Sequence, residues 1–125
     1  EEGGIDPTEV DYINAHGTGT YANDFSELTA IKELFKDSKT KPQVSSTKSI
    51  TGHTLGAAGA IEAIICCMVL KNQTIVPNKG LNEIEIDGIN YPMVTSKQDI
   101  KYTISNSFAF GGNNTSLIFG ICNED

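Results

Sequence analysis

The chain has 125 residues, enough for one domain, and 38% of them are apolar, which supports one modest core. Nine lysines and no arginine stand against sixteen aspartates and glutamates, so the formal net charge is −7. This balance argues against a protein that binds nucleic acid or lies on an anionic membrane surface, because both need a positive footprint. The sequence has no unbroken run of 18 apolar residues and no basic-then-apolar opening, so we expect neither a membrane span nor a secretory signal.

The first third of the chain alternates between strand and helix patterns. Residues 10–15 are rich in β-forming residues and predict a strand, which is followed by the glycine-containing loop 16–20. Apolar residues then recur at helical spacing and predict a helix over residues 24–36. Asp24, with Glu27 three residues later, has the spacing of a capping box at the start of that helix.

The middle of the chain repeats the pattern. Residues 43–47 predict a second short strand, and residues 48–53 a loop. A second helix is expected over residues 54–71, and because it is apolar nearly all round, we expect it to be buried on more than one side. Residues 74–76 form a candidate short strand, and residues 78–99 have no long period and predict an irregular connection.

The chain closes with a predicted β-hairpin. Residues 100–108 alternate and predict a strand, and residues 115–121 predict its partner beyond a glycine turn. Gly111 and Gly112 in that turn either bring backbone N–H groups close to an oxyanion or simply make the hairpin turn. The whole order predicts an α/β fold of the βαβαββ type, a mixed sheet with packed helices.

Two loop histidines are the first candidate site residues. His16 follows the first predicted strand, and His53 follows the second by a few residues. Ligands gather at the carboxyl ends of strands in α/β sheets, so the two imidazoles can converge on one pocket, or they can be unrelated loop residues. Thr18 and Thr20 share the loop of His16, where their hydroxyls either orient a ligand or hold the loop.

A carboxylate stands inside the apolar second helix. Glu62 costs several kcal/mol if it is buried without a partner. Lys48, at the end of the preceding strand, is its natural partner. The alternative is that Glu62 reaches the rim of the helix and is solvated.

Three cysteines, Cys66, Cys67 and Cys122, have no metal-like spacing, so we expect no metal site. The adjacent pair lies among apolar residues, where a thiol behaves as a small hydrophobe, and a structural role is favoured over a reactive one. Reduced thiols indicate a cytoplasmic protein.

Three segments in register carry a family resemblance. They are N-A-H-G-T-G-T at 14–20, S-S-T-K-S-I-T-G-H-T-L-G-A-A-G at 45–59 and N-S-F-A-F-G-G-N-N at 106–114. Together they resemble the β-ketoacyl-acyl carrier protein synthases, in particular the elongating, FabF-like type II condensing enzymes. The resemblance implies the thiolase fold, which has two similar halves. Residues 1–125 would form the C-terminal half, without the N-terminal half that bears the nucleophilic cysteine.

The resemblance implies a catalytic role for four residues. His16 and His53 match the two histidines that stabilise the enolate formed when a malonyl thioester on acyl carrier protein loses CO₂. Lys48 matches a lysine that keeps the second histidine, His53, neutral and oriented. Glu62 matches the acid that pairs with that lysine.

The resemblance also implies a substrate side. Thr18 and Thr20 match threonines that bind the phosphopantetheine arm. Phe110 matches a gating phenylalanine whose backbone N–H helps to form the oxyanion hole, and Phe108 lies beside it.

The implied activity is decarboxylative Claisen condensation by a 3-oxoacyl-[acyl-carrier-protein] synthase, an acyltransferase that needs no cofactor. The implied partners are acyl carrier protein, the missing N-terminal half and, at full length, a second copy in a homodimer; by itself this chain is expected to be inactive. The alternative is a part of a non-catalytic, chain-length-factor-like partner subunit. The presence of His16, Lys48, His53 and Glu62 together favours the enzyme.

Overall fold

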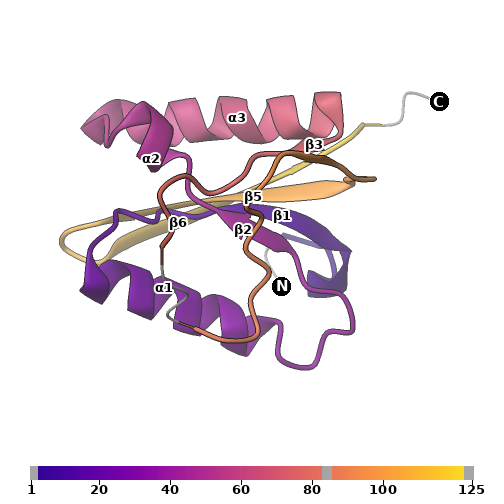
Figure 1. The fold of residues 1–125 in the computed structure, drawn as a ribbon, viewed down its shortest axis with the longest axis horizontal. Helices are drawn as coiled ribbons and strands as arrows, with labels where there is room; N and C mark the ends of the chain where they lie inside the picture. Colours follow the sequence, from indigo (N-terminus) through magenta and orange to yellow (C-terminus); the bar gives the residue numbers. More distant parts are fainter. Residues whose placement is uncertain (1–2, 83–85, 123–125) are drawn as a thin grey trace.

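The structure, a computed structural model, describes residues 3–82 and 86–122. It has three layers, in which a four-stranded sheet lies between helix α1 on one face and helices α2 and α3 on the other (Figure 1). The elements in chain order are η1 (Pro7–Glu9), β1 (Val10–Asn14), α1 (Tyr21–Leu34), β2 (Gln43–Ser45), α2 (Lys48–Thr51), η2 (Leu55–Ala57), α3 (Ala58–Asn72), β3 (Thr74–Ile75), β4 (Ser96–Lys97), β5 (Tyr102–Ala109) and β6 (Asn113–Gly120).

The sheet is mixed, as the sequence predicts. Its strand order is β2-β1-β5-β6, with β1 parallel to both β2 and β5, and β5 antiparallel to β6. Asn14, the last residue of β1, stands level with Ser45 on one side and Ser105 on the other. The two parallel strands β1 and β2 therefore end at the same edge of the sheet, where the loops that follow them meet.

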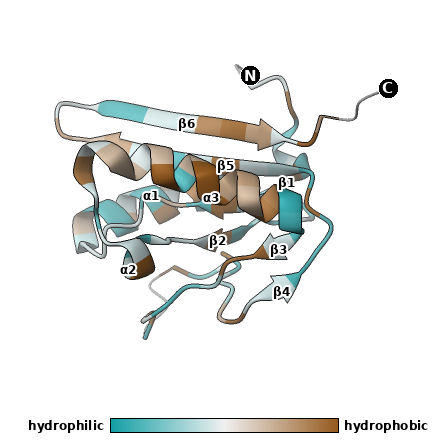
Figure 2. Ribbon diagram, turned by 90° about the horizontal axis from the view of Figure 1, so that it is seen from above, coloured by the Kyte–Doolittle hydropathy of each residue, from teal (hydrophilic) through white to brown (hydrophobic). Residues whose placement is uncertain are grey.

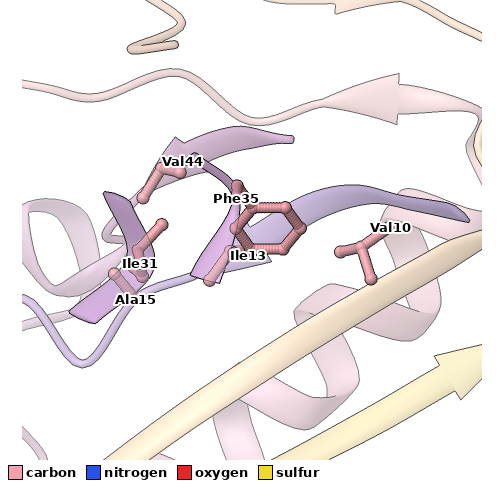
Figure 3. Packing of buried hydrophobic residues seen from close by; sticks show 6 residues of the cluster. All are labelled: Val10, Ile13, Ala15, Ile31, Phe35 and Val44. Carbon is pink, nitrogen blue, oxygen red and sulfur yellow. The ribbon is translucent and has the colours of Figure 1, made fainter. Parts of the chain in front are cut away.

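One half of the core lies between α1 and the sheet (Figure 3). Apolar residues of β1 and β2 pack there against Ile31 of α1 and against Phe35, which follows the last residue of the helix. The whole cluster comprises Val10, Ile13, Ala15, Ile31, Phe35 and Val44. Val10 and Ile13 share this side although strict alternation would separate them. The pairing of β1 with β5 shifts register between Val10 and Tyr12, and this irregularity turns the strand between them.

The other half of the core lies under α3. Figure 2 shows apolar residues along this helix, above β5. One face is buried against the sheet, but Ile64 is 60% exposed and Met68 is 55% exposed. The expectation that this helix is buried on more than one side is therefore wrong for the described chain, because no described element packs on its outer face. The buried residues of the helix are Ala58, Glu62, Cys66, Val69 and Leu70.

Two local predictions differ from the structure. Helix α1 begins at Tyr21 after Thr20, so the capping box predicted from Asp24 and Glu27 does not form; Asp24 instead accepts a hydrogen bond from the backbone of Gly19. Residues 48–53 were expected to be a loop, but Lys48–Thr51 form the single turn α2. Such a short turn leaves no periodicity for a sequence pattern to detect.

Residues Leu55–Asn72 are long and apolar enough, by length and composition alone, to cross a membrane, with a mean hydropathy of 1.5. The prediction of no span rested on unbroken apolar runs, and this segment contains Glu62 and Lys71. Its inner face packs on β5, and Glu62 is engaged in an ion pair. These contacts account for the apolar character of α3 as a helix that covers the sheet.

The three cysteines are free thiols with different surroundings. Cys66 is fully buried on the side of α3 that faces the sheet, and burial raises the pKa of its thiol to about 12. It behaves as the small hydrophobe that the sequence predicts. Cys67 and Cys122 are exposed, so the same prediction is wrong for Cys67, which lies one residue further around the helix and points away from the sheet.

Candidate functional site

The two histidines meet at the edge where β1 and β2 end. His16 lies two residues beyond β1, and His53 lies just beyond α2, the turn that follows β2. Their ring centroids are 5.5 Å apart, and the rings stand nearly perpendicular, at 88°. The two imidazoles therefore share one site, and the alternative of two unrelated loop histidines is wrong.

His16 is the buried member of the pair. It is only 6% exposed, and its ring also lies edge-on to Phe108, with centroids 5.6 Å apart. The pKa of His16 is lowered to about 4, chiefly by burial and further by the nearby Lys48 and His53, whereas Asp24 opposes the shift. His16 is therefore neutral at physiological pH. Its Nδ1 is buried and has no hydrogen-bond partner among the described residues, which leaves Nε2 as the nitrogen available to a ligand.

His53 is exposed, and a backbone contact defines its tautomer. Its Nδ1 accepts a hydrogen bond of 3.2 Å from the backbone N–H of Leu55. The neutral ring therefore carries its proton on Nε2. Leu55 has φ = +52°, a left-handed conformation that costs a branched residue about 1 kcal/mol. In this uncommon conformation, the backbone N–H of Leu55 reaches Nδ1 of His53 and holds the orientation of the imidazole.

Lys48 and Glu62 form a buried ion pair between α2 and α3. Lys48 Nζ donates to Glu62 Oε1, and the two side chains are 5% and 2% exposed. The predicted pairing is confirmed, and the alternative of a solvated Glu62 is wrong. The charge of Lys48 also contributes to the lowered pKa of His16, and the effect of Lys48 on His53 that the family resemblance implies stays a prediction.

Glu27 is a site residue that the sequence analysis did not find. It is 3% exposed, and its carboxylate accepts hydrogen bonds from the backbone N–H groups of His16 and Gly17, both at 2.9 Å, and from Asn106 Nδ2 at 3.0 Å. It therefore ties the histidine loop to β5. Burial raises the pKa of Glu27, and the three hydrogen bonds oppose that rise. The sequence signal was its position four residues before Ile31, on the apolar face of α1.

The histidine loop is also fixed to the segment after β2. Ser46 Oγ donates to the carbonyl of Gly17 at 2.8 Å. Gly17 has φ = +38°, and a Cβ at this position would come within 2.4 Å of the Ser46 Cβ. Only glycine fits so close an approach with this backbone conformation. Together with Glu27, this contact gives His16 a rigid support.

The four predicted substrate residues divide into two groups. Thr18 lines the same cleft as His53, and its hydroxyl shares a hydrogen bond of 2.9 Å with that of Thr20. Phe108 reaches the ring of His16, but Phe110 is fully exposed in the turn between β5 and β6. The structure therefore brings Phe108 to the histidines and leaves Phe110 outside. Gly111 and Gly112 both have positive φ and form the hairpin turn.

A cleft of about 310 Å³ opens beside the histidine loop. Lys48 and His53 line it together with Thr18, whereas His16 is not among its lining residues. Among the residues that the structure describes, no group of three potential metal ligands comes together. The other residues lining the cleft come from the histidine loop, α1, the β2–α2 segment and the loop near Asn78, namely Ala15, Gly17, Gly19, Asp24, Glu27, Leu28, Val44, Ser45, Ser46, Ser49, Asn78, Lys79, Gly80, Leu81 and Tyr91.

The chain is similar in sequence to known proteins. The family model described as Beta-ketoacyl synthase, C-terminal domain, matches residues 1–82. The chain is 43% identical over 121 residues to a 3-oxoacyl-[acyl-carrier-protein] synthase 2 from Staphylococcus aureus, covering 95% of this chain and 30% of that protein. It thus spans less than a third of that relative's length.

Solved structures show the same arrangement. A ketosynthase in complex with its chain length factor from Xenorhabdus doucetiae superimposes with a TM-score of 0.85 at 41% identity, covering 95% of this chain and 30% of the other. A type II PKS acyl carrier protein in complex with its ketosynthase contains a chain that superimposes with a TM-score of 0.87 at 32% identity, again covering 95% and 30%.

The layered fold is that of a thiolase-like ketosynthase. More particularly, the chain belongs to the beta-ketoacyl synthase family and corresponds to its C-terminal domain.

Proposed function

We propose that this chain supplies the histidine-bearing half of a 3-oxoacyl-[acyl-carrier-protein] synthase, an acyltransferase that extends an acyl chain by decarboxylative condensation. The observation that carries the proposal is the pairing of two imidazoles whose centroids lie 5.5 Å apart. His53 carries its ring proton on Nε2, and His16 is neutral with a pKa of about 4. Two imidazole N–H donors side by side suit an oxygen that gains negative charge.

The chemistry assigned to the pair is stabilisation of an enolate. The C–C bond to the carboxylate of a malonyl thioester breaks, CO₂ leaves, and the bonding electrons pass to the thioester carbonyl as an enolate. His16 and His53 would hydrogen-bond that oxygen through Nε2. Their interactions strengthen as charge develops, so they stabilise the transition state more than the bound substrate.

The condensation itself needs a group outside this chain. The enolate carbon attacks the carbonyl of an acyl-cysteine, the carbon–sulfur bond to that cysteine breaks, and a 3-oxoacyl thioester is formed. We place the nucleophilic cysteine in the half of the protein that this chain lacks. Cys66 is buried with a raised pKa and lies outside the histidine site, so it does not fit that role.

The partners follow from the same proposal. The malonyl group arrives on the phosphopantetheine arm of acyl carrier protein, with Thr18 and Thr20 as contacts for the arm. A solved ketosynthase similar to this chain is in complex with an acyl carrier protein. The missing N-terminal half and a second full-length copy complete the assembly. The three free thiols fit the cytoplasmic location that we propose.

A chimera tests the proposal. This chain replaces the matching C-terminal region of the Staphylococcus aureus 3-oxoacyl-[acyl-carrier-protein] synthase 2, and acylation of the active cysteine and decarboxylation of malonyl carrier protein are measured separately. We expect the chimera to do both and the isolated chain to do neither. His53→Ala should reduce decarboxylation by about 10²–10³-fold, the usual effect of losing one oxyanion donor, while acylation persists.

The same experiment separates the enzyme from a non-catalytic partner subunit. Acylation of the cysteine shows that the chimera has folded. A chimera that is acylated but does not decarboxylate malonyl carrier protein, even with both histidines present, would contradict the proposal and favour the chain-length-factor-like alternative. If His53→Ala instead abolished acylation alone, the role assigned to His53 would be wrong.

A further inference from the structure

The outer edge of β2 is covered by two asparagines that lie far along the chain. β2 is the outermost strand in the order β2-β1-β5-β6, so the N–H and C=O groups on its outer edge need partners beyond the sheet. The backbone carbonyl of Asn90 accepts from the N–H of Val44 at 2.8 Å. The next two groups on this edge, the carbonyl of Val44 and the N–H of Ser46, are paired by the side chain of Asn78.

Asn78 uses both ends of its side-chain amide. Its Nδ2 donates to the carbonyl of Val44 at 3.0 Å, and its Oδ1 accepts from the N–H of Ser46 at 3.2 Å. In a parallel ladder, one residue of the neighbouring strand likewise pairs with a carbonyl and with the N–H two residues further on. The Asn78 amide therefore replaces one residue of a neighbouring strand, at the point where β2 ends.

The surrounding backbone fixes Asn78 itself. Its N–H donates to the carbonyl of Pro92 at 2.8 Å, and its Nδ2 lies 3.4 Å from the same carbonyl. Pro77, the residue before it, is buried, and the proline ring restricts φ there. The side-chain amide of Asn78 therefore extends toward β2 from a backbone that is already held.

Ser46 connects this edge to the histidine loop. Its Oγ donates at 2.8 Å to the carbonyl of Gly17, the residue that follows His16. The N–H of Gly17 is held separately, by Glu27 of α1. Gly17 is thus held at its N–H from α1 and at its carbonyl from the segment after β2. The second contact can hold the loop only if the backbone of Ser46 is itself fixed.

We propose that Asn78 is a positioning residue of the histidine site that acts through Ser46, an inference that rests on the proposed function. The amide of Asn78 fixes the N–H of Ser46, and the hydroxyl of Ser46 fixes the carbonyl next to His16. An imidazole that donates to a developing oxyanion must be held in place, because a displacement of about 1 Å can cost about 10²-fold in rate. Asn78 and Ser46 also line the cleft that His53 lines, so this support stands beside the reacting groups.

Asn90 provides a matched comparison on the same edge. Its Nδ2 donates to the carbonyl of Lys41 at 3.0 Å, ahead of β2, so it also joins a side-chain amide to a backbone carbonyl. This contact lies at the opposite end of β2 from Ser46. Asn90→Ala therefore removes an amide contact of the same kind, keeps the backbone contact with Val44, and leaves the histidine loop untouched.

A double-mutant cycle tests whether Asn78 acts through Ser46. In the whole protein that carries this chain, we record the ring-proton NMR signals of His16, which depend on the two aromatic rings edge-on to it. Asn78→Ala and Ser46→Ala should each displace these signals, and Asn90→Ala should not. The double variant should match Ser46→Ala alone. Unchanged signals in Asn78→Ala, or displacements that add in the double variant, would overturn the inference.

Activity provides the second readout. In Asn78→Ala, kcat for malonyl decarboxylation should fall about tenfold and KM for the carrier protein should stay unchanged, whereas Asn90→Ala should match the parent. An equal fall in both variants would indicate a general weakening of the sheet edge and would contradict the assignment. If Asn78→Ala does not fold, Asn78→Ser replaces it, because the single short hydroxyl cannot reach Val44 and Ser46 together. The NMR signals need no substrate, so they are independent of the test of the proposed function.

Discussion

The ring of His16 stands edge-on to that of His53 at 5.5 Å, yet one imidazole is buried and the other is exposed. Burial keeps His16 neutral at physiological pH, whereas the backbone of Leu55 determines which nitrogen of His53 carries the proton. The two neighbouring imidazoles thus owe their states to different surroundings.

The low pKa of His16 should appear as a pH dependence of stability. The ordinary value is 6.5, and in the folded chain it is about 4. Between these values the unfolded chain binds a proton that the folded chain refuses, so stability is present above pH 6.5 and is lost as pH falls toward 4, by up to about 3 kcal/mol. Urea unfolding at pH 7 and pH 4.5 measures the loss. His16→Asn should show a smaller loss; an identical loss would contradict the assignment.

Replacing the buried ion pair should change the pKa of His16 without unfolding the chain. In the double variant Lys48→Met, Glu62→Met, both charges are gone, and stability should stay within about 2 kcal/mol of the parent because apolar side chains of similar length replace the pair. The pKa of His16, followed by NMR, should rise above about 4 but stay below 6.5, because burial remains its largest cause. No rise would show that Lys48 does not act on His16.

Breaking the pair on one side should be worse than removing it. Lys48→Met alone leaves a buried carboxylate without its cation and should cost about 3–5 kcal/mol in the free energy of unfolding. The double variant provides the control, and chemical denaturation provides the measurement. A single variant as stable as the double variant would mean that Glu62 finds another partner.

Glu27 should be necessary for the shape of the histidine loop. Glu27→Gln keeps the volume of the side chain, but its NH2 group faces one of the three N–H groups that now donate to the carboxylate. The lost hydrogen bond should lower the free energy of unfolding by about 2 kcal/mol. Hydrogen exchange at the amides of His16 and Gly17 should become faster. Glu33→Gln, on the exposed side of the same helix, is the matched control and should change stability by less than about 0.5 kcal/mol. Unchanged exchange in Glu27→Gln would contradict the role.

Thiol labelling should separate two adjacent cysteines. In the native chain, a small alkylating reagent should modify Cys67 and Cys122, which are exposed, and spare Cys66, which is buried with a pKa of about 12. After denaturation all three should react. Mass spectrometry of peptides gives the pattern directly. Rapid native labelling of Cys66 would mean that α3 opens away from the sheet.

Local patterns in the sequence were sufficient for most elements. Alternation in residues 10–14 and the helical spacing after Tyr21 reflect contacts that each segment makes with its own neighbours, so β1 and α1 could be predicted. The Lys48–Glu62 pair could be predicted for a similar local reason. A carboxylate in the middle of an apolar helix is buried when the helix packs, and a buried carboxylate needs a cation beside it. The order of elements, with the preference for right-handed crossovers, then predicted the mixed sheet.

Other features depend on which face of each element meets the sheet, and only the tertiary structure decided them. Glu27 has the sequence context of a helix cap, yet it is buried under the loop of His16. Cys66 and Cys67 are neighbours in an apolar run, but one faces β5 and the other faces away. Desolvation depends on everything that surrounds a group, and the groups around His16 come from loops, strands and helices far apart in the chain. The sequence alone therefore identified His16, His53 and the Lys48–Glu62 pair, whereas packing brought Glu27 to the site and set the protonation of His16.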